Sequence, residues 1–523
     1  MTFKFLVRLA FCAALSLSVA IPQVSRKPQQ PKLIVVVTVD QFRYDYLTRF
    51  RSEYTGGLQR LLTQGAVFTN AFYEHSPTVT AIGHSTITTG ASPALSGIVG
   101  NEWWDRESKK EITSVSDPSH QTLGAPDRVA ASPHRLLVST LGDEIKMSGK
   151  GESRVIGISF KDRSAILPAG RMGDAAYWFD NESGNFVSST WYMQQLPAWV
   201  QQHNAKRPGD RFLGAEWKTL SDSKSLKKLP TTPDTMFYSS VESSPFGNDL
   251  LEEMAELAIE NEKLGTHSGV DLLSVSFSSN DYVGHAEGPD SPQVHDMSVR
   301  TDRMLAKFFA YLDSKLGPGK TVVIFTADHG VAPVPEVNVG RRMPGGRLSD
   351  KEIGKAIESA LTARYGEGKW MANAKSQYAP YLNYELIAAK KLTPAEVRVV
   401  AADAVRNLPH ISRVYTKDQL LAGLPGVDFL SRRVSNGYYA PRGPDLVVIT
   451  EPYFMYSPRG TTHGAAFHYD AQVPVVLMGP GIKPGRYHKA AAVNDIAPTL
   501  ATLIDVAVPS GSMGRVLDEC LTY

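Results

Sequence analysis

Cysteine is almost absent from this sequence, with Cys12 and Cys520 the only two among 523 residues. Cys12 lies in an N-terminal apolar segment typical of a signal peptide, so cleavage would leave Cys520 alone. A single cysteine excludes an intramolecular disulfide, and the chain holds no cysteine cluster for a structural zinc site. Phe11, which precedes Cys12, is too bulky for a lipobox and argues against a lipid anchor.

The chain also lacks an excess of charge of either sign. Its 55 Lys and Arg against 53 Asp and Glu give a formal charge of +2. Removal of residues 1–20 would take away Lys4 and Arg8 and no acid, so the mature charge would be zero. A neutral chain has no general attraction to nucleic acid or to anionic membranes. We therefore expect no nucleic-acid partner.

Long hydrophobic runs are missing beyond residue 20, so we expect no stable membrane anchor. Residues 1–20 themselves read as a signal peptide, with Lys4 and Arg8 before an apolar run and Ser18-Val19-Ala20 as the cleavage site. A buried first helix is the alternative, whereas the run is too short for a transmembrane anchor. We predict secretion across the inner membrane and a periplasmic location, with a flexible lead-in at 21–32.

Six short apolar runs, several of them rich in β-branched residues, are typical of strands buried on both faces. They are 33–39, 155–160, 272–277, 321–327, 445–450 and 473–478. Helical periodicity lies between them at 250–264 and 299–316. We therefore predict an α/β fold with a largely parallel central sheet and helices on both faces. Four of the runs are followed by a charged residue: Asp40, Lys161, Asp281 and Asp328. Ligand sites in such sheets lie beyond the carboxyl ends of the strands, so we expect these residues to mark a site.

Two stretches interrupt this alternation. Residues 116–248 are rich in Gly, Pro and Ser, and we expect long loops near the site, apart from the strand at 155. Residues 345–426 predict an inserted small α/β lobe with helices at 350–365 and 394–407 and a strand at 411–415. The predicted catalytic domain is then 33–344 together with 427–523.

Thr80 lies in the stretch 77–86, which predicts an extended entry, a sharp turn and the start of a helix. A hydroxyl at a helix N-terminus lies where backbone N–H groups and the helix dipole favour an anion, so it is placed to attack phosphorus. The local alternative is an ordinary helix cap. Acids and histidines elsewhere in the chain favour the nucleophile.

Aspartate and histidine recur in short motifs at 281–285, 328–330 and 461–464. Each motif by itself is also typical of a surface loop, and His84 and His468 stay open as supporting residues. Together they can hold two zinc ions through nitrogen and oxygen atoms, although manganese or cobalt would suit the same donors. We predict one ligand set of Asp40, Thr80, Asp328 and His329, and another of Asp281, His285 and His463.

These motifs resemble those of the alkaline phosphatase superfamily, in its type I phosphodiesterase/nucleotide pyrophosphatase branch. The resemblance runs from about Leu33 to the C-terminus. Within this branch, the chain is similar to bacterial secreted alkaline phosphatases with a Thr nucleophile. It implies two zinc ions held as divided above, a phosphothreonine intermediate on Thr80, and small phosphate monoesters as substrates. It also implies that Asn101, Lys161 and Arg163 bind the phosphate.

Other functions compete with this interpretation. A metal-dependent phosphodiesterase or nucleotide pyrophosphatase would keep the same metals. The resemblance implies, however, that diesterases of this branch share the other motif residues but lack the pair that corresponds to Lys161 and Arg163. We expect that pair to point to one side of an extended segment. Thr80 argues against a sulfatase, which needs Cys or Ser, and against a phosphoglycerate mutase, which uses Ser. A non-enzymatic metal-binding protein is the third alternative, and the oligomeric state and natural substrate stay open.

Overall fold

The computed structural model describes residues 30–373, 379–423 and 428–522. The predicted signal peptide and most of the lead-in lie outside these ranges. Among the described helices, none combines the length and the apolar character needed to cross a bilayer.

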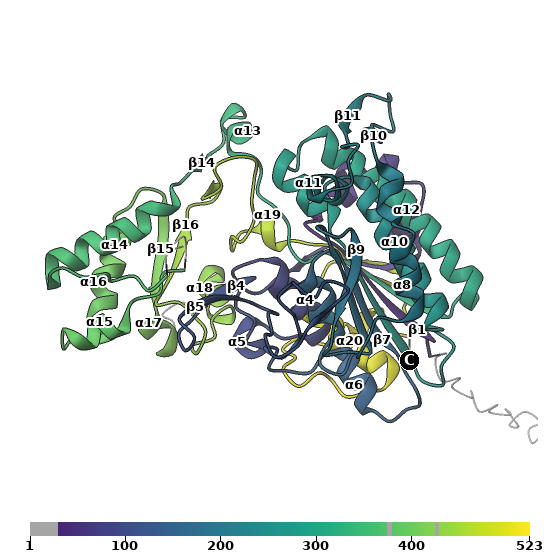
Figure 1. The fold of residues 1–523 in the computed structure, drawn as a ribbon, viewed down its shortest axis with the longest axis horizontal. Helices are drawn as coiled ribbons and strands as arrows, with labels where there is room; N and C mark the ends of the chain where they lie inside the picture. Colours follow the sequence, from purple (N-terminus) through teal and green to yellow (C-terminus); the bar gives the residue numbers. More distant parts are fainter. Residues whose placement is uncertain (1–29, 374–378, 424–427, 523) are drawn as a thin grey trace, which may run out of the picture.

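The predicted α/β fold is confirmed: a ten-stranded, mostly parallel sheet forms the centre of the molecule (Figure 1). Five neighbouring strands at its centre run parallel, and antiparallel pairings add the next strands on both sides. The outermost strand on one side pairs in parallel with its neighbour. In spatial order the strands are β19 (Gly485–Tyr487), β2 (Ala66–Phe68), β18 (Val475–Met478), β13 (Thr321–Thr326), β1 (Leu33–Val39), β12 (Asp271–Phe277), β7 (Val155–Ser159), β8 (Ala175–Asp180), β9 (Asn185–Ser189) and β6 (Thr122–Leu123).

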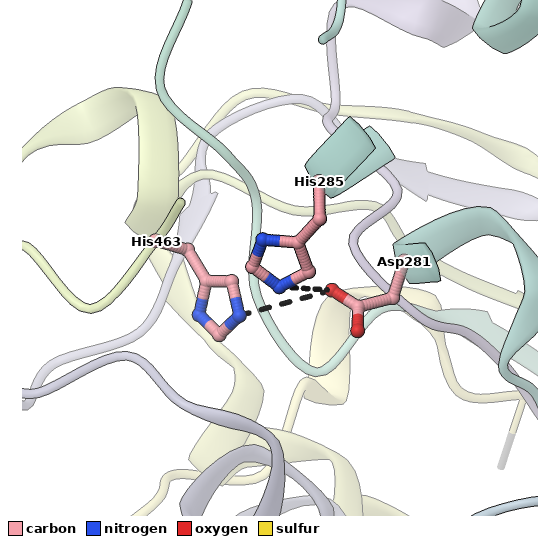
Figure 2. Close-up of side chains that lie close together, drawn as sticks. All are labelled: Asp281, His285 and His463. Atoms are coloured by element: carbon pink, nitrogen blue, oxygen red, sulfur yellow. Dashed lines mark ion pairs between the residues drawn. The ribbon is translucent and has the colours of Figure 1, made fainter. Parts of the chain in front are cut away.

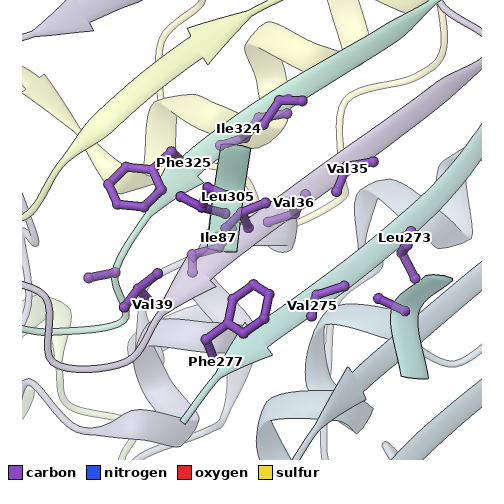
Figure 3. Packing of buried hydrophobic residues seen from close by; sticks show 14 of the residues in the cluster. Val35, Val36, Val39, Ile87, Leu273, Val275, Phe277, Leu305, Ile324 and Phe325 are labelled. Carbon is purple, nitrogen blue, oxygen red and sulfur yellow. The ribbon is translucent and has the colours of Figure 1, made fainter. Parts of the chain in front are cut away.

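Strand β1 shows why the apolar runs become central strands. All seven of its residues are buried, because strands pair on both of its edges and helices cover both of its faces. Val35 and Val36 pack among Leu273, Leu305 and Ile324 of neighbouring elements (Figure 3). The core thus fixes the direction and register of the strands whose ends carry the candidate site residues.

Helices cover the two faces of the sheet, with α10 and α12 on one side and α4, α6 and α20 on the other (Figure 1). Both predicted helices, at 250–264 and 299–316, are present and begin earlier than expected. The helices of the main body are α2 (Tyr46–Arg49), α3 (Gly57–Gln64), α4 (Thr80–Thr89), α5 (Pro93–Ser96), α6 (Leu141–Met147), α7 (Asp162–Ala169), α8 (Ala198–Ala205), α9 (Thr235–Glu242), α10 (Pro245–Asn261), α11 (Ser279–Glu287), α12 (Pro292–Leu316), α13 (Pro335–Gly340), α19 (His468–Ala471) and α20 (Ile496–Ile504).

A small lobe with its own hydrophobic core projects from this body (Figure 1). Its predicted helices and strand are present, and one of its sheets joins β15 to β16 in antiparallel register. The elements of this region are β14 (Gly346–Arg347), α14 (Asp350–Tyr365), α15 (Tyr384–Ala389), α16 (Pro394–Arg406), β15 (Ile411–Thr416), α17 (Lys417–Leu421), α18 (Phe429–Asn436), β16 (Leu446–Thr450) and β17 (Phe454–Met455).

The prediction that the run at 445–450 joins the central sheet is therefore wrong. Leu446 and Val448 of β16 instead complete the core of the lobe beside Val414 of β15. An apolar run shows that a strand is buried but does not name its partner. The boundary proposed at residue 426 stays a prediction, although the buried core extends past it to Val448.

Residues 116–248 are more regular than expected. Strands β6, β8 and β9 from this stretch extend the central sheet at one edge, so it is not mainly loop. Short two-stranded pairs account for β3 (Ala71–Phe72) with β20 (Ala491–Ala492), β4 (Glu102–Asp105) with β5 (Lys110–Thr113), and β10 (Glu216–Lys218) with β11 (Ser225–Lys228).

Candidate active site

Four charged residues meet at one edge of the sheet because their strands are neighbours. The spatial order β13, β1, β12, β7 brings together Asp328, Asp40, Asp281 and Lys161 from beyond the carboxyl ends of these strands. Parallel strands end at the same edge, so residues far apart in sequence converge there.

Asp281, His285 and His463 form one compact group, here called the second ligand group (Figure 2). Asp281 and His285 lie one turn apart on α11, so their side chains share a face of the helix. The Nε2 atoms of His285 and His463 lie 3.2 and 3.7 Å from Oδ1 of Asp281. Nitrogen and oxygen donors at this spacing suit a divalent transition metal.

Asp40, Asp328 and His329 form the first ligand group, and all three are fully buried. Nε2 of His329 lies 3.4 Å from Oδ1 of Asp40 and 3.3 Å from Oδ2 of Asp328. Oδ1 of Asp40 accepts no hydrogen bond from any described residue. A buried carboxylate oxygen without a donor is costly, and a cation beside it would remove the cost.

The three histidines of these two groups share one hydrogen-bonding pattern. Nδ1 of His285, His329 and His463 lies 2.9, 2.9 and 2.8 Å from the backbone carbonyl oxygens of Thr461, Gly330 and Thr78. A carbonyl oxygen only accepts, so each Nδ1 carries the hydrogen and each Nε2 keeps a lone pair. This arrangement fits metal ligation through Nε2.

Thr80 is the first residue of α4, and the structure places its Oγ1 3.4 Å from Nε2 of His329. The helix can approach the first ligand group this closely because residue 83 is glycine. A Cβ atom added at Gly83 would lie 2.1 Å from the backbone oxygen of Asp328. Thr80 thus combines a buried hydroxyl, a helix N-terminus and a neighbouring ligand group.

Lys161 joins the two groups electrostatically. Its Nζ donates to Oδ2 of Asp40 and to Oδ2 of Asp281, at 2.6 Å each, and the side chain is buried. Burial alone would lower the pKa of Lys161, but the carboxylates of Asp281 and Asp40 outweigh it and raise the pKa. Lys161 therefore keeps its positive charge at the centre of the site.

The carboxylates of the site respond unequally to their crowding. Burial, and then the charges of Asp281 and Asp328, hold the pKa of Asp40 well above its ordinary value. Burial also opposes ionisation of Asp281, but His285 and Lys161 outweigh it and hold its pKa well below the ordinary value. Asp40 is thus the carboxylate on which repulsion from the other two stays unrelieved, and a cation bound beside it would neutralise that repulsion.

The other predicted phosphate-binding residues lie around Thr80 and Lys161. Oδ1 of Asn101 accepts from the backbone N–H of Ala81, the residue after Thr80, at 2.8 Å. The prediction that Lys161 and Arg163 share an extended segment is wrong, because Lys161 precedes α7 and Arg163 lies in its first turn. Nε of Arg163 is buried and has no hydrogen-bond partner among the described residues.

Two further residues contact this site: Gln41, which the sequence did not nominate, and His84, which it left open as a supporting residue. Gln41 donates from its backbone to Asp328 and from its side chain to Asp281. His84 contacts the backbone oxygen of Thr80 through Nδ1 at 2.9 Å and Ser276 Oγ through Nε2 at 2.8 Å. The position of Gln41 directly after the strand-end Asp40 is the signal that could have drawn attention to it.

Comparison with known proteins places this geometry in a family. The family model "Type I phosphodiesterase / nucleotide pyrophosphatase" matches residues 34–468. A protein of Myroides odoratus named "Calcium-transporting ATPase" is 35% identical over an alignment of 552 residues that covers 100% of both chains. Alkaline phosphatase PhoV of Synechococcus elongatus is 37% identical over 520 residues, covering 94% of this chain and 93% of PhoV.

The fold agrees with these sequence relatives. A crystal structure of wild-type alkaline phosphatase PafA matches with a TM-score of 0.87 and 34% identity, covering 94% of this chain and 99% of that one. The resemblance drawn from the motifs is thereby confirmed. The chain belongs to the type I phosphodiesterase/nucleotide pyrophosphatase family of the alkaline phosphatase superfamily, and within it to the PafA-like alkaline phosphatases.

Proposed function

We propose that this protein is a secreted alkaline phosphatase that hydrolyses phosphate monoesters through a phosphothreonine intermediate on Thr80. The observation that carries the proposal is the position of Thr80, at a helix N-terminus and 3.4 Å from His329 of the first ligand group. The relatives named alkaline phosphatase support the same activity. The predicted signal peptide supports a periplasmic location.

The two ligand groups fit a pair of divalent metal ions, and we propose zinc. Six protein ligands provide three imidazole nitrogens and three carboxylates, and Thr80 is the additional oxygen of the first group. All three imidazoles present Nε2, as the hydrogen bonds of their Nδ1 atoms require. When bound, the metals would lower the pKa of the Thr80 hydroxyl and stabilise the charge that develops on the leaving oxygen.

The residues of this chain then have separate tasks in the reaction. The Thr80 hydroxyl gives its proton to solvent water, and Oγ attacks phosphorus in line, forming the Oγ–P bond while the bond to the ester oxygen breaks. The alcohol leaves with a proton taken back from water. Water next attacks the phosphothreonine from the side that the alcohol has left, releasing phosphate and restoring Thr80. The N-terminus of α4 favours the negative charge of the phosphoryl group throughout.

Three side chains would bind the non-bridging oxygens of the phosphoryl group. Oδ1 of Asn101 accepts a hydrogen bond from the backbone N–H of Ala81. The Nδ2 group of Asn101 would then donate to the substrate. Lys161 supplies a buried charge between the ligand groups, and Arg163 supplies a donor without a partner in the described structure. Charge-assisted hydrogen bonds of this kind favour the dianionic monoester over the singly charged diester.

A phosphodiesterase or nucleotide pyrophosphatase is the second candidate, since the family model carries that description. Lys161 and Arg163 argue for the monoesterase. Purified protein should release alcohol from an aryl phosphate monoester much faster than from the matching diester, and metal analysis of the same sample should find two zinc ions per chain. A preference for the diester would reverse the assignment. Activity that survives removal of metal by a chelator would contradict the metal-dependent mechanism.

A further inference from the structure

Gln41 adopts an unusual backbone conformation at the centre of the site. It follows the ligand Asp40, is 2% exposed, and has a φ angle of 63°, in the left-handed region that favours glycine. A non-glycine residue held there is strained, and such strain persists where surrounding contacts determine the backbone conformation.

The contacts of Gln41 reach both ligand groups. Its backbone N–H donates to Oδ1 of Asp328 at 3.1 Å, and its Nε2 donates to Oδ1 of Asp281 at 2.6 Å. Oδ1 of Asp281 is also the oxygen that faces the Nε2 atoms of His285 and His463. One neutral residue thus orients a carboxylate of the first group and a carboxylate of the second group.

Gly284 makes room for this amide. A Cβ atom added at residue 284 would lie 1.8 Å from Oε1 of Gln41. Any larger residue would push the amide away and break its hydrogen bond to Asp281. This contact gives a steric reason for the glycine between the ligands Asp281 and His285.

We propose that Gln41 is a positioning residue that fixes Asp281 for metal binding through its side chain and Asp328 through its backbone. Hydrogen bonds to a ligating carboxylate fix its orientation, and their loss typically weakens metal binding by about 10–100-fold. The left-handed backbone is what lets both donors point to their carboxylates at once. This inference rests on the proposed function, because it requires that both ligand groups bind metal.

Two variants remove the side-chain donor of Gln41 and keep its backbone N–H. Gln41→Gly keeps the backbone N–H and suits the left-handed φ, whereas Gln41→Met keeps the side-chain length and removes the donor. In zinc titrations against a competing chelator, both variants should lower the zinc affinity of the second ligand group by about 10–100-fold and leave the zinc affinity of the first group unchanged. The variants His285→Ala and His329→Ala assign each binding step to its group.

A spectroscopic readout is independent of activity. Cobalt suits the same donors, and its visible absorption reports ligand geometry. The band of cobalt in the second group should change in both Gln41 variants. Lys263→Gly is the matched control, because Lys263 is exposed and also has a left-handed φ, of 54°. It should leave both zinc affinities and the cobalt spectrum unchanged.

Gly284→Ala tests the same contact from the other side. It should weaken the second group as Gln41→Met does, and it should add little further loss in a Gln41→Gly background, since the amide it displaces is already gone. Full additivity of the two changes would overturn the proposed contact. If Gln41→Met fails to fold, Gln41→Gly decides the question, because its φ is relaxed.

These measurements distinguish a failure of the two-metal centre from a failure of the proposed role of Gln41. Wild-type protein that binds fewer than two metal ions would refute the two-metal centre itself, whatever Gln41 does. Wild-type protein that binds two, with both Gln41 variants unchanged, would overturn the role of Gln41 alone. Equal weakening of both groups would show general structural support and would also overturn the proposal.

Discussion

Arg163→Ala is the substitution that tests substrate choice with least disturbance of the protein. The side chain of Arg163 lies 3.6 Å from Asp162 in a partly exposed ion pair, and its buried Nε has no partner among the described residues. Exposed pairs of this kind contribute roughly 0–1 kcal/mol to stability. We therefore expect a correctly folded variant with a nearly unchanged free energy of unfolding.

The effect on catalysis should be much larger. A charge-assisted hydrogen bond to a non-bridging oxygen contributes about 1.5–3 kcal/mol, which corresponds to about 10–150-fold in kcat/KM if it forms in the transition state. A diester lacks one of these oxygens and one negative charge, so kcat/KM for the diester should fall less in Arg163→Ala than kcat/KM for the monoester. The double variant Lys161→Ala/Arg163→Ala should lose on the order of a hundredfold or more against monoesters.

Lys161→Ala should behave differently, because Lys161 lies between Asp40 and Asp281. Removing one partner of a buried ion pair costs about 3–5 kcal/mol, so the metal-free variant should unfold more easily than metal-free Arg163→Ala. Added zinc should recover more stability in Lys161→Ala than in wild type, because the metal replaces the missing positive charge.

The assay measures kcat/KM for an aryl phosphate monoester and for the matching diester, alongside urea unfolding with and without zinc. Arg432→Ala, at an exposed arginine outside the site, is the matched control and should change none of these quantities. Equal losses on monoester and diester in Arg163→Ala would mean that the residue supports the site generally. The argument for a monoesterase would then lose its main residue-level support.

Further substitutions test the remaining roles. Thr80→Ala should fold and bind metal but lose roughly 10³-fold or more in kcat; near-normal turnover would move the nucleophile elsewhere. His285→Ala and His329→Ala should each lower the zinc content by about one ion, with activity partly restored by added zinc; unchanged zinc in both would contradict the ligand groups. Burial raises the pKa of Asp470 to about 8 from 3.8. The folded state therefore keeps a proton that the unfolded state loses, and stability should fall as the pH rises between these values. Asp470→Asn should flatten that decline in urea midpoints, and a parallel decline in the variant would refute the attribution.

Much of the site was already determined by the sequence. Parallel strands end at one edge of a sheet, so apolar runs followed by Asp40, Asp281 and Asp328 were enough to predict a common site. A hydroxyl at the start of a helical stretch nominated Thr80 only together with the acids and histidines elsewhere in the chain, since by itself it also fits an ordinary helix cap. These inferences depend on local periodicity and on one general property of α/β sheets, and neither needs the order of the strands.

The tertiary structure alone decided which strands are neighbours and which side chains meet. An apolar run does not name its partner, so β16 paired with β15 in the lobe and not with the central sheet. The turn after β7 put Lys161 between two carboxylates and Arg163 in a helix, which residue spacing could not show. The bridge made by Gln41 joins residues more than 200 positions apart, and such long-range contacts exist only once the core has fixed the register of β1, β12 and β13.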